Sequence, residues 1–207
     1  MGSPSFFIRL DGCPLRCSWC DTPYALAGDA GTATSVEALA RECSSFDRVV
    51  ITGGEPLAQD IAPLLDRLDA RQHVTVETSG AIFADLPRVS LFSISPKVGS
   101  SGYTPKLLAL RRFCATAAGR MQLKFVIADD RDLAEALACL DALGEDLPPR
   151  TPVVLQPESA SAGKGERYHE SLRRLTERVV GDVRWRRYDV RVLPQLHYLL
   201  WHGEAGR

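Results

Sequence analysis

The sequence lacks a long hydrophobic run, a strong net charge and any feature of a secretory signal. No apolar stretch approaches the roughly 18 residues that a membrane-spanning helix needs. The first residues show no charged region, apolar stretch and cleavage site in succession. These absences predict a cytoplasmic protein without a membrane partner.

The chain also has no excess of charge of either sign, since 25 basic and 26 acidic residues leave a formal net charge of −1. A chain so balanced has no long-range field to attract nucleic acid or an anionic surface, so no nucleic-acid partner is expected. The only basic cluster runs from Arg184 to Arg187 and is interpreted as a solvated face.

Disulfides are not expected, although the chain contains six cysteines, because a reducing compartment keeps thiols free. Cys43, Cys114 and Cys139 are scattered, and Cys43 and Cys139 lie in helical apolar patterns typical of small buried thiols. The other three, Cys13, Cys17 and Cys20, crowd into eight residues. They need a different explanation.

The fold class follows from an alternation of β-rich runs and amphipathic helical stretches. This rhythm predicts an α/β fold with parallel strands and right-handed crossovers, either an open doubly wound sheet or a partial barrel. The 207 residues suffice for one core, so residues 1–207 are taken as a single domain. The expected strands are Phe6–Leu10, Val49–Thr52, Val74–Glu77, Leu91–Ser95, Gln122–Ile127, Val153–Gln156 and Asp189–Leu193. The clearest helical stripes lie at 36–43, 61–68 and 133–140, with Thr34 or Ser35 as a cap for the first.

Polar motifs follow five of these strands. In parallel α/β folds, sites assemble at the carboxyl ends of the strands, so the motifs predict one shared pocket. In chain order they are the cysteine cluster, Thr52-Gly53-Gly54-Glu55-Pro56, Glu77-Thr78-Ser79-Gly80, Ser95-Pro96-Lys97 and Gln156-Pro157-Glu158.

The cysteine spacing Cys13-x3-Cys17-x2-Cys20 places three soft thiolate ligands on one short loop. A [4Fe–4S] cluster normally takes four cysteines, so three leave one iron open to a chelating molecule. If that molecule is S-adenosylmethionine (SAM), an electron from the cluster cleaves its sulfonium and generates a 5′-deoxyadenosyl radical. The glycine pair allows close approach of backbone carbonyls and amides to the SAM amino group, and Glu55 would orient either the loop or that ammonium.

A structural zinc site of three cysteines and one histidine is the alternative. Zinc ligands usually come in pairs separated by an intervening stretch, and this loop has no second pair. The four histidines, at positions 73, 169, 197 and 202, are remote in sequence. The spacing therefore favours the iron–sulfur cluster.

With these motifs, the sequence resembles the radical SAM superfamily and, more narrowly, the 7-carboxy-7-deazaguanine synthase family. The narrower resemblance rests on Trp19-Cys20-Asp21-Thr22-x-Tyr24-Ala25 and on Pro194-Gln195-x-His197. It implies a homodimer of partial (β/α) barrels that converts 6-carboxy-5,6,7,8-tetrahydropterin to 7-carboxy-7-deazaguanine with loss of ammonia. SAM would be used catalytically, Mg²⁺ would be required, and a flavodoxin or ferredoxin would supply electrons.

The resemblance also implies roles for individual residues. Thr22 would bind Mg²⁺ through its hydroxyl, Arg9 the substrate carboxylate and Thr52 the pterin, and His197 would help close the pocket. As plain alternatives, Thr22 is a turn hydroxyl, Arg9 forms a salt bridge and His197 is a packed side chain. The residues expected to hold SAM are Cys20, Asp21, Gly53, Gly54, Glu55, Ser95, Pro96, Lys97, Gln156 and Pro157. Of these, Lys97 could instead be a surface lysine, and Lys124 needs a partner that is either SAM or a structural glutamate.

The ends of the chain depart from the family pattern. A strand and a Gln-Gly-Glu-Gly segment that hold substrate in the family are absent before Met1-Gly2-Ser3-Pro4, and Trp201–Arg207 runs on at the other end. We expect pterin recognition to be affected before the cluster or SAM site. The competing functions are a glycyl-radical activating enzyme, which acts on a protein, and a non-catalytic zinc-binding interaction module.

Overall fold

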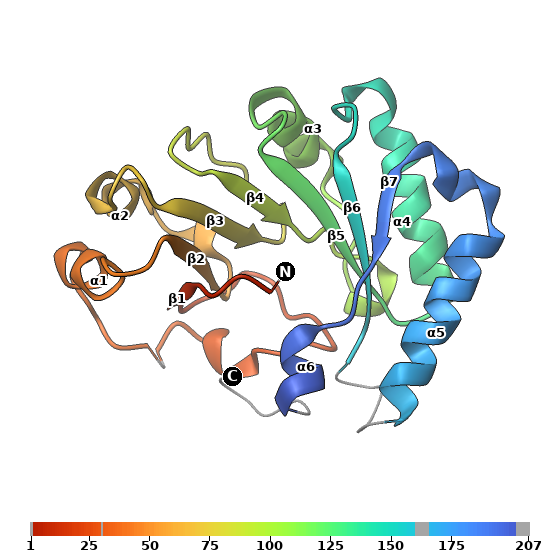
Figure 1. Ribbon diagram of the computed structural model, residues 1–207, viewed down its shortest axis with the longest axis horizontal. Coiled ribbons are helices and arrows are strands. Elements are labelled where there is room, and N and C mark those ends of the chain that lie inside the picture. The colour runs from red at the N-terminus through yellow and green to blue at the C-terminus, as the bar shows by residue number, and fades with distance from the viewer. Residues whose placement is uncertain (1, 30, 160–165, 202–207) are drawn as a thin grey trace.

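A seven-stranded parallel sheet forms the framework of the chain, and its strands follow one another in chain order (Figure 1). The computed structural model describes residues 2–29, 31–159 and 166–201. Consecutive order is that of a barrel wall, whereas a doubly wound sheet reverses direction at a switch point. The sheet is thus a partial barrel, open between its first and last strands in the described part of the chain. Its strands are β1 (Phe6–Leu10), β2 (Arg48–Gly53), β3 (His73–Thr78), β4 (Leu91–Ile94), β5 (Met121–Ile127), β6 (Pro152–Pro157) and β7 (Asp189–Val192).

All seven predicted strands are confirmed, with ends that shift by a residue or so. The predicted helical stripes are confirmed as well, and Ser35 caps α1 by accepting a hydrogen bond from the Ala38 amide. The helices are α1 (Val36–Glu42), α2 (Ala62–Arg67), α3 (Leu107–Thr116), α4 (Asp130–Leu143), α5 (Glu166–Gly181) and α6 (Leu196–Trp201). Short 3-10 helices are η1 (Pro23–Ala25), η2 (Pro56–Ala58), η3 (Gly99–Ser101), η4 (Gly144–Asp146) and η5 (Val183–Arg187). Within the described ranges, no helix is both long and apolar enough to cross a membrane.

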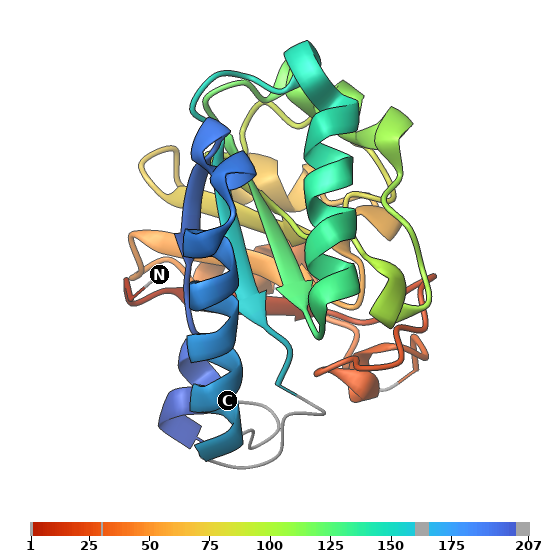
Figure 2. The same ribbon diagram turned by 90° about the vertical axis from the view of Figure 1, so that its right-hand side faces the viewer.

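The main core lies between the sheet and the helices α1 to α5, which cover its outer face (Figures 1 and 2). Alternate strand residues, such as Val49 and Ile51 of β2 or Leu123 and Phe125 of β5, point into this layer and are fully buried. Burying them is worth about 1.5–3 kcal/mol for each large side chain. Because the apolar side chains pack on the outer face, the inner face of the sheet can carry polar side chains.

The inner face of the partial barrel carries a row of polar side chains. The strand register places Arg9 beside Thr52, Glu77 beside Ser93, and Ser93 beside Gln122. The Thr52 hydroxyl donates to Glu77 at 3.2 Å, and the Gln122 amide donates to Ser93 at 2.9 Å. Polar groups inside a fold are usually paired in this way. The row forms a polar lining next to the carboxyl edge of the sheet.

Candidate functional site

The loop that carries the cysteine motif begins where β1 ends and is closed on itself by backbone hydrogen bonds. The Asp11 carboxylate accepts from the amides of Gly12, Gly28 and Gly31 at 2.8, 3.2 and 2.8 Å. The Gly12 amide also approaches the Ala25 carbonyl at 3.1 Å. One aspartate thus ties both ends of the loop together.

The three cysteines of this loop are free thiols and only partly buried. A turn brings two of them close, since the Cys20 amide donates to the Cys17 carbonyl at 3.2 Å. Burial raises the pKa of Cys13 and Cys17, and the nearby Lys97 ammonium opposes this rise. Desolvation disfavours the charged thiolate form, and a nearby cation favours it.

The cysteine loop supplies the kind of ligands that an iron–sulfur cluster takes. A zinc ion needs all its ligands within about 2.0–2.3 Å of one point. Among the described residues, no three His, Cys, Asp or Glu side chains gather as they would around a single ion. In a cluster each cysteine binds a different iron, so the thiols surround a larger body. Cys13, Cys17 and Cys20 are therefore the residues that fit a [4Fe–4S] cluster.

The two glycines at the end of β2 are required by close contact with the end of β1 and the start of the cysteine loop. A Cβ on Gly53, whose φ is +144°, would lie 2.0 Å from the Leu10 carbonyl oxygen, and one on Gly54 would lie 2.2 Å from that of Gly12. The Gly54 and Glu55 amides donate to these two carbonyls, each at 2.9 Å. The expectation that backbone amides of this motif are available to a ligand is thus wrong for Gly54 and Glu55. Their N–H groups join β2 to the cysteine loop.

Glu55 is a buried carboxylate, 1% exposed, that connects this motif to the next. One of its oxygens accepts from the Leu57 amide at 3.1 Å and from the Thr78 hydroxyl at 2.6 Å. The other accepts from the Ser79 amide at 2.8 Å and from the Ser79 hydroxyl. Four donors satisfy a carboxylate almost completely. Of the two roles considered for Glu55, orienting the loop is the one that its contacts support.

Lys97 lies between the cysteine loop and the strand ends. Its Nζ is 3.3 Å from the Ser95 hydroxyl and 5.4 Å from the centre of the Trp19 ring. Burial lowers the pKa of Lys97, whereas the thiol of Cys17 acts in the opposite direction. The ammonium also interacts electrostatically with the side chains of Lys124, Asp21 and Glu55. Lys97 is therefore largely buried beside the cysteine loop and is not a surface lysine.

Three of the four residues expected to bind substrate or Mg²⁺, namely Arg9, Thr22 and Thr52, lie together beside the same loop. Arg9 Nη1 is 3.4 Å from the Thr22 hydroxyl, which in turn lies 3.0 Å from an Asp21 oxygen. Arg9 neighbours Thr52 across the β1–β2 ladder and makes no ion pair with any described residue. The salt-bridge alternative for Arg9 is thus not supported. Its guanidinium has donors to offer a ligand.

Sequence reasoning assigned no role to several polar residues of the inner sheet face. Glu77 was noted only as part of a motif, although it accepts the hydrogen bond of Thr52 and faces the same interior. Ser93 and Gln122 form the pair next to it. The signal that could have found them is the strand alternation, which sends every second residue to this face.

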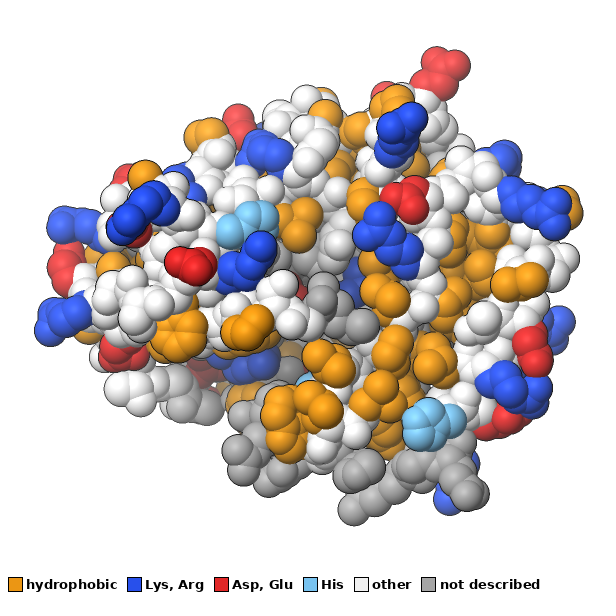
Figure 3. All heavy atoms as spheres, viewed as in Figure 1, with side chains coloured by type: hydrophobic (Ala, Val, Ile, Leu, Met, Phe, Trp, Pro, Cys, Tyr) orange, Lys and Arg blue, Asp and Glu red, His pale blue; other side chains and the backbone are white. Residues whose placement is uncertain are grey.

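Gln156, on β6, and His197, on α6, lie in a second part of the chain, where β6 meets the C-terminal segment. The Gln156 amide donates to the Pro194 carbonyl at 3.0 Å, and the Gln195 amide lies 2.6 Å from the Tyr168 hydroxyl. Tyr198 stacks on Tyr168 with ring centres 4.5 Å apart, so Tyr198 and not His197 is the packed side chain of α6. In the described ranges, no hydrogen bond joins this part to the cysteine loop. Apolar side chains gather over α6 and α5 on the face shown in Figure 3.

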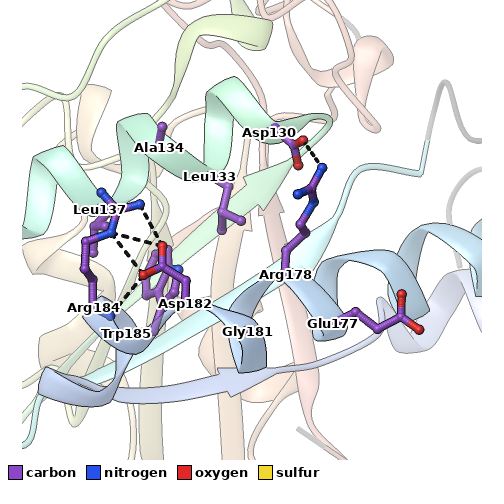
Figure 4. Close-up of a pocket in the computed structure, with 10 residues that line it drawn as sticks. All are labelled: Asp130, Leu133, Ala134, Leu137, Glu177, Arg178, Gly181, Asp182, Arg184 and Trp185. Atoms are coloured by element: carbon purple, nitrogen blue, oxygen red, sulfur yellow. Dashed lines mark hydrogen bonds and ion pairs between the residues drawn. The ribbon is translucent and has the colours of Figure 1, made fainter.

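A hollow in the described structure lies away from this site, on the outer helical layer. It has a volume of about 400 Å³ and runs between α4 and α5, with Trp185 in its wall (Figure 4). The ion pair between Arg178 and Asp130, at 2.6 Å, crosses it, and Arg184 pairs with Asp182 at 2.7 Å. The basic run that includes Arg184 thus lies on a solvated, ion-paired face, as predicted.

A partial barrel with a three-cysteine loop at the carboxyl end of its first strand is the architecture of a radical SAM protein. Residues 7–104 match the family model described as the radical SAM superfamily. Within that superfamily, the chain belongs to the 7-carboxy-7-deazaguanine synthase family. A relative of this name from Pyrobaculum aerophilum is 35% identical, over all of this chain and 90% of its own length. Another, from Halobacterium salinarum, is 33% identical over 97% of this chain and 84% of its own.

A solved structure agrees with these relatives. The crystal structure of QueE from Escherichia coli superposes with a TM-score of 0.66 at 28% sequence identity, covering 93% of this chain and 86% of that one. The predicted family and fold class are confirmed. Neither the glycyl-radical activating enzyme nor the zinc module is favoured by these similarities.

Proposed function

We propose that this chain is a radical SAM lyase that converts 6-carboxy-5,6,7,8-tetrahydropterin to 7-carboxy-7-deazaguanine, with ring contraction and loss of ammonia, in deazapurine biosynthesis. Support comes from the relatives named for this product and from the structure of the site. The observation that carries the proposal is the grouping of Arg9, Thr22, Thr52 and Glu77 beside the cysteine loop.

The chemistry of these side chains matches that of the substrate. The planar guanidinium of Arg9 suits a carboxylate, which it binds through two parallel hydrogen bonds. Glu77 accepts hydrogen bonds only, so with Thr52 it offers a partner for the N–H groups of a pterin ring. The inner sheet face thereby holds the ring while Arg9 holds its carboxylate.

We assign the cofactors to residues of the cysteine loop and of the strand ends. Cys13, Cys17 and Cys20 would hold the cluster. The residues that would contribute to the SAM site are Cys20, Asp21, Gly53, Gly54, Glu55, Ser95, Pro96, Lys97, Gln156 and Pro157. When bound, the cluster and SAM together supply a carbon radical that takes a hydrogen atom from the substrate. The Lys97 ammonium compensates the negative charge of the thiolates. Glu55 fixes the loop after β2 against the loop that carries them.

Several finer assignments remain predictions. They are the homodimer, the flavodoxin- or ferredoxin-type electron donor, the cytoplasmic location, the single domain and the part of His197 in closing the pocket. The Mg²⁺ requirement is also a prediction, and Thr22 gives a direct way to test it.

Thr22→Ala should weaken the response of the enzyme to Mg²⁺ while leaving the cluster intact. The Thr22 hydroxyl is a hard oxygen ligand beside Asp21, and magnesium usually takes one or two protein oxygens and completes its shell with water or substrate. We expect the Mg²⁺ concentration for half-maximal activity to rise about tenfold or more, the effect of losing about 1.4 kcal/mol or more of binding free energy. Thr34→Ala, on an exposed loop, is the control. An unchanged Mg²⁺ titration would remove Thr22 from the metal site.

The proposed reaction is tested by anaerobic reconstitution with iron, sulfide, SAM, Mg²⁺, a reductant and 6-carboxytetrahydropterin. We expect 7-carboxy-7-deazaguanine by mass spectrometry without matching consumption of SAM. Formation of deoxyadenosine without this product would retain the radical SAM class and reject the substrate. A colourless protein that binds one zinc and no SAM would reject both.

A further inference from the structure

Asp132, in the first turn of α4, is a fully buried carboxylate outside every motif discussed above, at 0% exposure. Its oxygens accept from the Ser100 amide at 2.9 Å, from the Ser100 hydroxyl and from the Ala128 amide at 2.8 Å. One turn later, Glu135 accepts from the Gly99 amide at 2.6 Å. Two acidic side chains of α4 thus hold the backbone of η3, the short helix that follows Lys97.

The short helix η3 and a residue that follows it hold the cysteine loop in turn. The Ser18 amide donates to the Ser101 carbonyl at 3.2 Å, and the Ser18 hydroxyl donates to the Ser100 carbonyl. The Arg16 amide donates to the Tyr103 hydroxyl at 2.8 Å. These contacts fall on the residues on either side of Cys17. η3 therefore supports the loop from the side of α4.

Trp19, between the second and third cysteines, makes the contact that depends on Asp132. Its Nε1 donates to the Ser100 hydroxyl oxygen at 2.8 Å. A serine hydroxyl has one proton to give, whereas a carboxylate can only accept. The Ser100 hydroxyl therefore donates its hydrogen bond to Asp132. Its oxygen lone pairs are then free to accept from the Trp19 N–H. Chains of this kind strengthen each successive hydrogen bond.

We propose that Asp132 is a positioning residue that holds the cluster-binding loop in place through Ser100 and Trp19, although it touches no cysteine. The inference rests on the proposed function, because the loop is taken to bind the cluster. The position of the Trp19 ring also bears on Lys97, whose Nζ lies 5.4 Å from the ring centre. A displaced Trp19 ring would move the segment between Cys17 and Cys20. It would also alter the surroundings of the Lys97 ammonium.

Three variants test this chain of contacts. Ser100→Ala removes both side-chain bonds. Trp19→Phe removes the indole N–H together with part of the ring, and Asp132→Asn places an amide donor where Ser100 needs an acceptor. The first measurement is hydrogen–deuterium exchange of residues 13–20 in the cluster-free chain. We expect about tenfold faster exchange in Ser100→Ala and in Asp132→Asn, because about one hydrogen bond of the closed loop is lost. Glu135→Gln is the matched control, since it weakens a bond to η3 without a link to Trp19.

The second measurement is made on reconstituted protein, by electron paramagnetic resonance of the reduced cluster with and without SAM and by the rate of SAM cleavage. We expect an altered signal and a severalfold slower cleavage in Ser100→Ala and Trp19→Phe. The double variant should be no worse than Ser100→Ala, because residues acting through one bond are not additive. Additive effects, or unchanged exchange of residues 13–20, would overturn the proposal.

Failure of the proposed function gives a different result. In that case the unaltered protein does not cleave SAM, while the exchange measurement on the cluster-free chain still decides whether Asp132 positions the loop. Should Asp132→Asn not fold, Ser100→Ala and Trp19→Phe carry the test.

Discussion

Cys17→Ala should abolish the charge-transfer absorption of the cluster and all cleavage of SAM. The loop has three thiols for three irons, and the remaining cysteines cannot replace a lost ligand. Cys43, Cys114 and Cys139 are buried in the core, and burial raises the pKa of Cys114 to about 11 and that of Cys139 to about 12. A thiol with so high a pKa is neutral near pH 7 and is a poor ligand.

The measurement is visible absorption with iron and sulfide analysis after anaerobic reconstitution, followed by quantification of deoxyadenosine. Cys43→Ala is the control, because Cys43 is equally a cysteine yet 0% exposed at the C-terminal end of α1 and outside the loop. We expect this control to keep the full complement of iron. A brown Cys17→Ala protein that still forms deoxyadenosine would show that the cysteine assignment is wrong.

Glu55→Gln should destabilise the protein by about 2–4 kcal/mol, because it puts an amide where the structure needs only acceptors. Each carboxylate oxygen of Glu55 accepts from a backbone amide, of Leu57 on one side and of Ser79 on the other. Whichever way the glutamine amide turns, its NH₂ meets one of these N–H groups, which cannot rotate away. The buried amide is then left without an acceptor.

Urea unfolding of the cluster-free chain measures this effect on the free energy of unfolding. Glu145→Gln makes the same change of charge at an exposed position and should shift that free energy by no more than about 0.5 kcal/mol. Because Glu55 joins the second motif to the third, we also expect Glu55→Gln to take up less iron. If Glu55→Gln changed the free energy of unfolding no more than Glu145→Gln does, Glu55 would not be needed to hold these loops together.

The elements and the cysteine site could be predicted from local patterns. Val49–Thr52 and Val74–Glu77 are short β-rich runs, and their strands extend only one residue further on either side in the structure. The spacing of Cys13, Cys17 and Cys20 is likewise local, because all three ligands lie on one loop. Side-chain chemistry within a few residues is enough to specify such features.

The order of the strands and the partners of buried polar groups were decided by tertiary structure. Periodicity alone left a doubly wound sheet and a partial barrel open, since both alternate strands with helices. The consecutive strand order distinguishes them. Likewise, the sequence does not show that Gly54 is required by the Gly12 carbonyl or that Asp132 reaches Ser100.

The physical reason is the range of the interactions. By itself the sequence determined the α/β class, the cysteine loop and the edge of the sheet where the motifs meet, because hydrophobic periodicity and ligand spacing act over a few residues. Only the fold could assign Glu55 to Thr78 and Asp132 to Ser100, contacts 23 and 32 residues apart. A buried carboxylate takes whatever donors the packing brings to it, and that packing is a property of the whole chain.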